Sequence, residues 1–290
     1  MKKSRRSTGT TRGGTSPERR GRPAHRPRKR FAQHFLERPW VERLVAALDA
    51  RPTDTFIEIG PGRGALTHPL AARVPRLLAI EIDRDLAAAL KATAPENVEV
   101  VEGDVLRQDL AALVTRGGAL PADSRLRVVG NLPYNISSPV LFKLMDVGTL
   151  PIVDATLMLQ REVADRLLAQ PGSRDYGRLT VLATRHATIA RLFNLPPGAF
   201  RPAPAVHSSV VRLTFHPPAA DVHDADLFER LVRELFSHRR KTLLNALKPL
   251  ASSRGADANQ MLASAEIDGT RRPETLDLTE LARLANALMV

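Results

Sequence analysis

Short apolar runs alternate with longer amphipathic stretches through the first two thirds of the chain. The apolar runs read FIEIG, LLAIEID, VEVVEGD and RVVGNL, and each precedes a helix-like stretch such as ALTHPLAARV or RDLAAALKATA. Near-continuous apolar strands separated by helices are typical of a parallel sheet that is covered on both faces. The pattern therefore predicts an α/β fold, with two further strands at 155–160 and 209–215.

After about residue 217 the pattern becomes purely helical. Five apolar residues recur there at helical spacing: Phe228, Leu231, Val232, Leu235 and Phe236. Another helix is predicted to begin at Asp277, whose side chain can cap free backbone amides while Glu280 returns the bond three positions later. We predict a Rossmann-like domain over residues 31–217 and a small all-helical domain over residues 218–290.

The net charge of +12 is concentrated at the N-terminus. Residues 1–30 hold twelve Lys or Arg residues and one acid, Glu18, so the rest of the chain is nearly neutral. This segment is rich in Ser, Thr, Gly and Pro and is predicted to be a disordered basic arm, because it cannot bury enough apolar surface to fold. A phosphate-binding arm, a solubilising extension and a transit peptide all fit it.

The chain has no cysteine, which excludes disulfides and thiolate metal sites. We predict no metal site. No apolar run approaches the roughly 18 residues of a membrane helix, and the basic N-terminus lacks the apolar segment of a secretory signal. The sequence predicts a cytoplasmic protein with no membrane partner.

Three predicted strand ends carry residues suited to a nucleoside ligand. The first is followed by a glycine-rich turn, where Gly60 and Gly62 let the backbone approach a ligand beside Glu58. The second ends in Glu81, whose carboxylate can accept both ribose hydroxyl protons. The third ends in Asp104, which can accept a hydrogen bond from an adenine amine. The turn and Glu81 also fit NAD, but the set fits S-adenosylmethionine better.

The fourth predicted strand ends in Asn131-Leu132-Pro133-Tyr134. An adenine N6 amine is a poor nucleophile because its lone pair is delocalised into the ring. The Asn131 side-chain oxygen and the Leu132 carbonyl could each accept one N6–H, while Pro133 restricts the backbone and Tyr134 stacks on an extruded base. Phe200, in a proline-rich turn, could cover the other face. A strand end with core aromatic residues is the alternative reading.

Together these motifs resemble the KsgA-type ribosomal small-subunit RNA adenine dimethyltransferases. Beyond the two motifs above, the resemblance rests on RFAQHFL (30–36), MLQREVADRL (158–167), DYGRLTVL (175–182), FRPAPAVHSSVVRL (200–213), RRKTLLNAL (239–247) and RPETL (272–276). It implies a class I S-adenosylmethionine-dependent methyltransferase that dimethylates two adjacent adenines near the 3′ end of small-subunit (16S) ribosomal RNA. The implied partner is the immature small ribosomal subunit.

The resemblance also implies roles for individual residues. Cofactor contacts fall on His34, Leu36, Gly60, Glu81, Asp104 and Asn131. Tyr134 and Phe200 would sandwich the target base, and Arg239, Arg240 and Lys241 would face RNA. The family usually has asparagine where this chain has His34, which makes that contact less secure. Nothing in the sequence resembles a dimer seam, so we expect a monomer.

Two other functions share these features. A macrolide-resistance methyltransferase of large-subunit RNA has the same cofactor pocket and a similar catalytic motif, but YGRLTVL and RRKTLLNAL argue against it. A non-catalytic assembly or transcription factor on the same fold is disfavoured by the intact strand-end acids.

Overall fold

The computed structural model describes residues 34–116, 118, 120–121, 123–145 and 150–289. The predicted basic arm of residues 1–30 lies outside these residues, as does part of the RFAQHFL motif.

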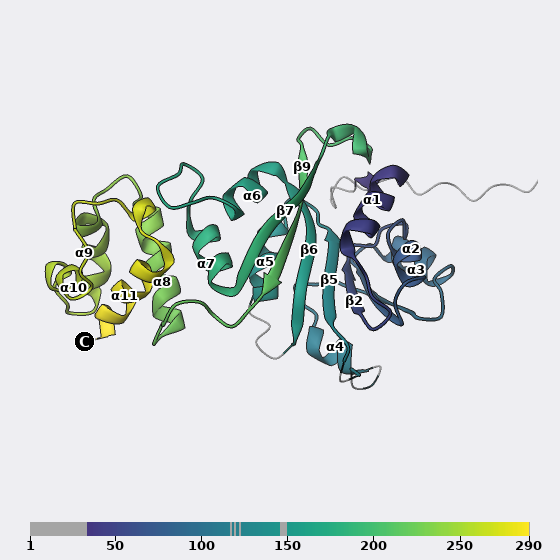
Figure 1. Ribbon diagram of the computed structural model, residues 1–290, viewed down its shortest axis with the longest axis horizontal. Coiled ribbons are helices and arrows are strands. Elements are labelled where there is room, and N and C mark those ends of the chain that lie inside the picture. The colour runs from purple at the N-terminus through teal and green to yellow at the C-terminus, as the bar shows by residue number, and fades with distance from the viewer. Residues whose placement is uncertain (1–33, 117, 119, 122, 146–149, 290) are drawn as a thin grey trace, which may run out of the picture.

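A seven-stranded sheet forms the centre of the molecule, as Figure 1 shows. Its strands, in spatial order, are β4 (Val98–Glu102), β3 (Arg76–Glu81), β2 (Thr55–Ile59), β5 (Leu126–Asn131), β6 (Ile152–Gln160), β9 (Ser208–Phe215) and β7 (Ala187–Leu195). The first five are parallel, and β9 runs antiparallel to both β6 and β7. The predicted α/β fold is confirmed, and so are the six strands that the sequence indicated.

The strand order reverses between β2 and β5. The chain builds outward from β2 to β4 and then returns to place β5 on the other side of β2. Gly130 allows these two strands to lie close, because a Cβ there would come within 3.0 Å of the Ile59 carbonyl oxygen. In open α/β sheets, ligands bind outside the carboxyl ends of the strands at such a reversal.

Helices cover both faces of the sheet. Successive side chains of β3 point to opposite faces of the sheet. Leu78 and Ile80 pack into the apolar core on one face, and Leu77 and Ala79 pack into the cores on the other face. The first cluster includes residues of α4 (Leu110–Arg116), α5 (Ser137–Met145), α6 (Arg161–Leu167) and α7 (Arg178–His186). The opposite face packs against α1 (Arg38–Leu48), α2 (Thr67–Ala71) and α3 (Arg84–Lys91).

A buried ion network links β5 and β6 to Asp54, the residue before β2. Arg127 of β5 is 2 % exposed, and its guanidinium lies 2.9 Å from Asp54 and 2.8 Å from Asp154. Arg125 adds a second cation 2.7 Å from Asp54. Burial alone would raise the pKa of Asp54, but hydrogen bonds from the two arginines and from the Arg51 amide outweigh it and hold the pKa low. Loss of one member would leave a charge buried without its partner, which is strongly destabilising.

The C-terminal helices form a cluster at one end of the molecule (Figure 1). They are α8 (Ala225–Ser237), α9 (Leu243–Ser253), α10 (Ala258–Ser264) and α11 (Leu278–Asn286), with short 3₁₀ helices at Pro273–Thr275 and Ala287–Met289. Asp277 and Glu280 form the predicted capping box of α11. The apolar core of this cluster also contains Val181 and Leu182 of α7. A domain boundary near residue 217 remains a prediction, and α7 packs into the cores on both sides of it.

Candidate active site

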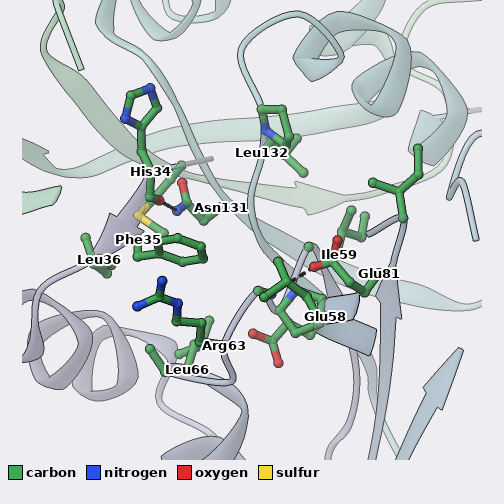
Figure 2. A pocket seen from close by; sticks show the side chains of 18 of the residues that line it. His34, Phe35, Leu36, Glu58, Ile59, Arg63, Leu66, Glu81, Asn131 and Leu132 are labelled. Atoms are coloured by element: carbon green, nitrogen blue, oxygen red, sulfur yellow. Dashed lines mark hydrogen bonds between the residues drawn. The ribbon is translucent and has the colours of Figure 1, made fainter. Parts of the chain in front are cut away.

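A cavity of about 500 Å³ lies at the carboxyl ends of β2, β3, β4 and β5, where the strand order reverses (Figure 2). It brings together eleven of the residues predicted from the sequence: His34, Leu36, Glu58, Gly60, Gly62, Glu81, Asp104, Asn131, Leu132, Pro133 and Tyr134. Phe200, Arg239, Arg240 and Lys241 do not line it.

The glycine-rich turn after β2 forms the floor of the cavity. Gly60 and Gly62 have φ angles of 71° and 59°, a left-handed region that side chains with a Cβ rarely adopt. A Cβ on Gly62 would also come within 3.1 Å of the Phe35 ring. Two conditions, backbone conformation and close packing, therefore require glycine at position 62.

Glu81 fastens this turn to the end of β3. Its Oε2 accepts a hydrogen bond from the Gly62 amide at 2.9 Å, and its Oε1 accepts one from the Asp83 amide at 2.9 Å. Burial raises the pKa of Glu81, although the two amides oppose that shift. A carboxylate has about four acceptor positions, so Glu81 can still accept hydroxyl protons from a ligand.

Glu58 lies behind the turn in β2. The residue is 2 % exposed, and among the described residues its Oε2 has no hydrogen-bond partner. Burial raises the pKa of Glu58 to about 7; the Thr67 hydroxyl opposes this rise and the charge of Glu81 adds to it. A buried carboxyl with an unused oxygen is suited to a cationic ligand in the cavity.

Asp104 follows β4 and is only partly buried. Its Oδ1 accepts a hydrogen bond from the Leu106 amide at 3.0 Å, while its Oδ2 lies 3.9 Å from Nε of Arg107. The first contact is a local turn of the kind that any strand-end aspartate can make. Its position at the cavity wall is the feature that suits a ligand.

The orientation of the Asn131 side chain is fixed by a single hydrogen bond. Its Nδ2 donates to the main-chain carbonyl oxygen of His34 at 2.9 Å (Figure 2). Because a carbonyl oxygen only accepts, this partner identifies the nitrogen end of the amide. The Oδ1 atom therefore points away from His34, and no side chain or amide of the described residues donates a hydrogen bond to it.

Tyr134 stands beside this amide. Its hydroxyl lies 2.9 Å from Oγ of Ser208, and burial raises the pKa of the phenol while Ser208 opposes the shift. The Tyr134 ring faces the His34 imidazole, with ring centroids 6.0 Å apart and an interplanar angle of 25°. Leu132 is 1 % exposed, so its side chain anchors the motif in the core.

A two-stranded sheet brings the start of the described chain to this site. β1 (Phe35–Leu36) pairs antiparallel with β8 (Phe200–Arg201), so that Leu36 lies opposite Phe200. Phe200 is 1 % exposed and packs in the core with residues of α1. Its ring presents no face to the cavity in this structure, and its predicted stacking role remains a prediction.

Several cavity residues were missed by the sequence reasoning. Ile82 is 44 % exposed directly after Glu81, and Arg63 lies with its guanidinium carbon 4.4 Å from the centroid of the Phe35 ring. Met158 enters from β6. A large apolar residue immediately after a strand-end acid is the signal that could have identified Ile82.

The predicted RNA-facing residues lie in the turn between α8 and α9. Arg240 and Lys241 are exposed, whereas Arg239 donates a hydrogen bond to the Arg174 carbonyl at 3.0 Å. Arg239 thereby joins Arg166, Arg174 and Arg178 around a second, separate cleft. This basic turn (Arg239–Lys241) is part of the C-terminal cluster and not of the cavity.

Within the part of the chain that the structure describes, no helix is long and apolar enough to cross a membrane, and no group of His, Asp or Glu side chains is placed to hold a metal ion.

Comparison with known proteins agrees with the resemblance seen in the sequence. The family model described as ribosomal RNA adenine dimethylase matches residues 24–284. The chain belongs to the ribosomal RNA adenine dimethylase family. Its predicted class I methyltransferase fold and its enzymatic class are thereby confirmed.

Individual relatives of this family cover nearly the whole chain. The ribosomal RNA small subunit methyltransferase A of Pseudomonas aeruginosa is 47 % identical over 91 % of this chain and 95 % of its own length. That of Alcanivorax borkumensis is 44 % identical over 90 % of each. Among solved structures, a dimethyladenosine transferase from Plasmodium falciparum has a TM-score of 0.69 at 25 % identity, covering 87 % of this chain and 96 % of its own.

The large-subunit branch is also similar in structure. The 23S rRNA methyltransferase ErmE has a TM-score of 0.62 at 26 % identity, covering 88 % of this chain and 100 % of its own. The identity to the small-subunit enzymes is much higher, so the comparisons favour the small-subunit function.

Proposed function

We propose that this protein transfers methyl groups from S-adenosylmethionine to the N6 amines of two adjacent adenosines near the 3′ end of small-subunit (16S) ribosomal RNA. The substrate would be the immature small ribosomal subunit. The observation that carries this proposal is the Asn131 amide oxygen, which is held as an open acceptor at the wall of a nucleoside-sized cavity.

The cavity residues fit S-adenosylmethionine. Its volume of about 500 Å³ lies within the range of about 300–1,000 Å³ typical of cofactor pockets. Glu58, Glu81 and Asp104 supply negative charge for a ligand that carries a sulfonium and an ammonium group. Gly62 keeps the floor open where a side chain would collide. When bound, the cofactor supplies an electrophilic methyl group on its sulfonium.

We assign the residues of this protein separate tasks. Glu81 would hold the ribose hydroxyls and Asp104 the adenine amine of the cofactor, while the exposed side chain of Ile82 offers an apolar wall. His34 and Leu36 close the cavity from the β1 side, and the His34 carbonyl orients Asn131.

The target adenine requires a second set of contacts. The Asn131 oxygen and the Leu132 carbonyl would accept hydrogen bonds from the two N6–H groups, which favours the pyramidal amine whose lone pair can attack the methyl group. This attack would break the bond between the methyl carbon and the sulfonium sulfur, leaving S-adenosylhomocysteine, and the methylated amine would then release one proton to water. No strong base is needed to form the bond. Tyr134 would stack on the extruded base, a contact worth about 1–3 kcal/mol.

The RNA would be held mainly through its phosphates. Folded RNA is recognised largely by shape and backbone, with only extruded bases read directly. The exposed Arg240 and Lys241, with Arg239 at the edge of the basic cleft, suit such contacts. Contacts of this kind position the RNA without reading its sequence.

The test is product mapping. Small subunits from a strain lacking the native enzyme, and protein-free large-subunit RNA, would each be incubated with the protein and S-adenosylmethionine. We expect mass spectrometry of nuclease digests to find N6,N6-dimethyladenosine at two adjacent positions in small-subunit RNA only. Methylation of large-subunit RNA alone would overturn the proposal, and absence of methylation with no calorimetric binding of S-adenosylmethionine would indicate a non-catalytic factor.

A further inference from the structure

The order of the strands sets the direction in which S-adenosylmethionine would lie in the cavity. Asp104 follows β4, Glu81 ends β3, and the glycine-rich turn follows β2; these three strands are neighbours in the sheet in this order. With Asp104 assigned to the adenine and Glu81 to the ribose, the next part of the cofactor is its amino-acid arm. That arm would therefore lie beside the turn after β2.

The amino-acid arm needs a cation as well as the acids of the cavity. It carries a carboxylate in addition to its ammonium group. Glu81 and Asp104 suit the positive groups of the cofactor, but negative side chains repel a carboxylate. A guanidinium suits it best, because the N–H groups form a planar fork that matches the two carboxylate oxygens.

Among the described residues, three arginines line the cavity. Two of them take part in exposed ion pairs, Arg38 with Glu42 at 2.9 Å and Arg201 with Glu37 at 3.2 Å. Neither belongs to the glycine-rich turn. Arg63 lies in the turn itself, directly after its second glycine. The position along the strand order thus singles out Arg63 as the cation beside the amino-acid arm.

An aromatic ring restricts the Arg63 side chain. The guanidinium carbon lies 4.4 Å from the centroid of the Phe35 ring, which also covers Gly62 (Figure 2). A cation over a ring is attracted by the electrons of the ring face. This contact holds the arginine in place without occupying an N–H donor, since the ring face is not a conventional hydrogen-bond acceptor. The guanidinium is therefore preorganised at this end of the cavity.

We propose that Arg63 binds the carboxylate of the amino-acid arm of S-adenosylmethionine and so selects cofactors that carry this group. The inference rests on the proposed function and deepens it. Because Arg63 is exposed, the carboxylate would lie where the cavity opens to solvent, and the contact would be weaker than that of a buried ion pair.

The experiment uses substitutions that separate the charge of Arg63 from its shape. Arg63→Met removes the charge and keeps an unbranched side chain against Phe35. Arg63→Lys keeps the charge without the planar fork. Arg43→Met is the matched control, because Arg43 is also exposed and its guanidinium carbon also lies 4.4 Å from an aromatic centroid, that of Phe193, but it does not line the cavity. Thermal unfolding of each variant checks that the fold is kept.

Two ligands that differ in one group identify the contact. S-adenosylmethionine carries the carboxylate, and decarboxylated S-adenosylmethionine lacks it while keeping the sulfonium, the amine and the adenosine. Calorimetry gives the Kd of each ligand for each variant without any methyl transfer. The ratio of the two Kd values measures how strongly a protein selects the carboxylate.

For Arg63→Met we expect the Kd for S-adenosylmethionine to rise about tenfold, a usual cost of losing one hydrogen bond between charged groups. The Kd for the decarboxylated ligand should change less than twofold, so the selection for the carboxylate is lost. Arg63→Lys should recover part of this selection, and Arg43→Met should match the wild type with both ligands.

The inference is overturned if a folded Arg63→Met protein keeps the wild-type Kd for S-adenosylmethionine. It is also overturned if this variant loses affinity for both ligands equally, because the side chain would then support the cavity without contacting the carboxylate. A wild-type protein that binds neither ligand would instead overturn the proposed function, and the inference with it.

Discussion

Replacing Glu58 with glutamine removes one buried titratable group and leaves its size nearly unchanged. The folded-state pKa of Glu58 is about 7, whereas the ordinary value is 4.5. Between these two values the folded protein keeps a proton that the unfolded chain releases. The free energy of unfolding therefore falls as the pH rises from 4.5 to about 7, by about 3 kcal/mol in all for this one group.

The assay is urea unfolding of wild type and Glu58→Gln at pH 5 and at pH 8. We expect the variant to gain about 2–3 kcal/mol relative to wild type between these two pH values, because most of the window lies between them. Glu102→Gln is the matched control: Glu102 is an exposed acid at the end of β4, so this variant should show the same change in the free energy of unfolding between pH 5 and pH 8 as the wild type. An equal change in wild type and Glu58→Gln would refute the reasoning.

The same titration should affect cofactor binding with the opposite sign. Above pH 7 the Glu58 carboxyl is ionised and attracts the cationic ligand, and below pH 7 it is protonated. Calorimetry should therefore show the affinity for S-adenosylmethionine falling by up to about tenfold from pH 8 to pH 6 in wild type. The affinity of Glu58→Gln should vary much less over this range.

Two further predictions concern the RNA contacts and the buried ion network. Changing Arg239, Arg240 and Lys241 together to alanine should weaken small-subunit binding. The slope of log K against log salt concentration should become shallower by up to about 0.7–0.9 per lost phosphate contact, while the cofactor affinity measured by calorimetry stays unchanged. An unaltered slope would contradict the assignment. Arg127→Met should lower the free energy of unfolding by about 3–5 kcal/mol in urea titrations, because it removes the cation 2.8 Å from the buried Asp154 carboxylate, whereas Asp54 keeps Arg125. A loss below about 1 kcal/mol would show that the network is dispensable.

Features set by local pattern could be predicted from the sequence. The buried strands have near-continuous apolar runs, and each is followed by a turn or an acid that marks its carboxyl end. Because parallel strands end at one edge of the sheet, residues from four strand ends could be placed in one site before any coordinates were known. The tetrapeptide of residues 131–134 after β5, to which we assign catalysis, was placed at this edge by the same reasoning.

Features set by long-range pairing could not be predicted. β7 was missed because it is an edge strand with several half-exposed positions, including Arg191, which weakens the alternation that identifies a strand. β1 and β8 have two residues each and show no periodicity, yet their pairing decides where the His34 ring points and buries Phe200. An aromatic residue before a proline-rich turn carries no local signal that separates a core position from a cavity wall.

The account depends most directly on the Asn131 amide oxygen as an acceptor for the adenine amine. The decisive measurement is the single-turnover rate of methyl transfer to unmethylated small subunits by Asn131→Ala, at saturating S-adenosylmethionine and with thermal unfolding as a check on the fold. We predict a fall of about 10²–10³-fold, the usual cost of removing one preorganised hydrogen-bonding group from a transition state. A folded Asn131→Ala protein with a rate close to wild type would contradict the proposed chemistry.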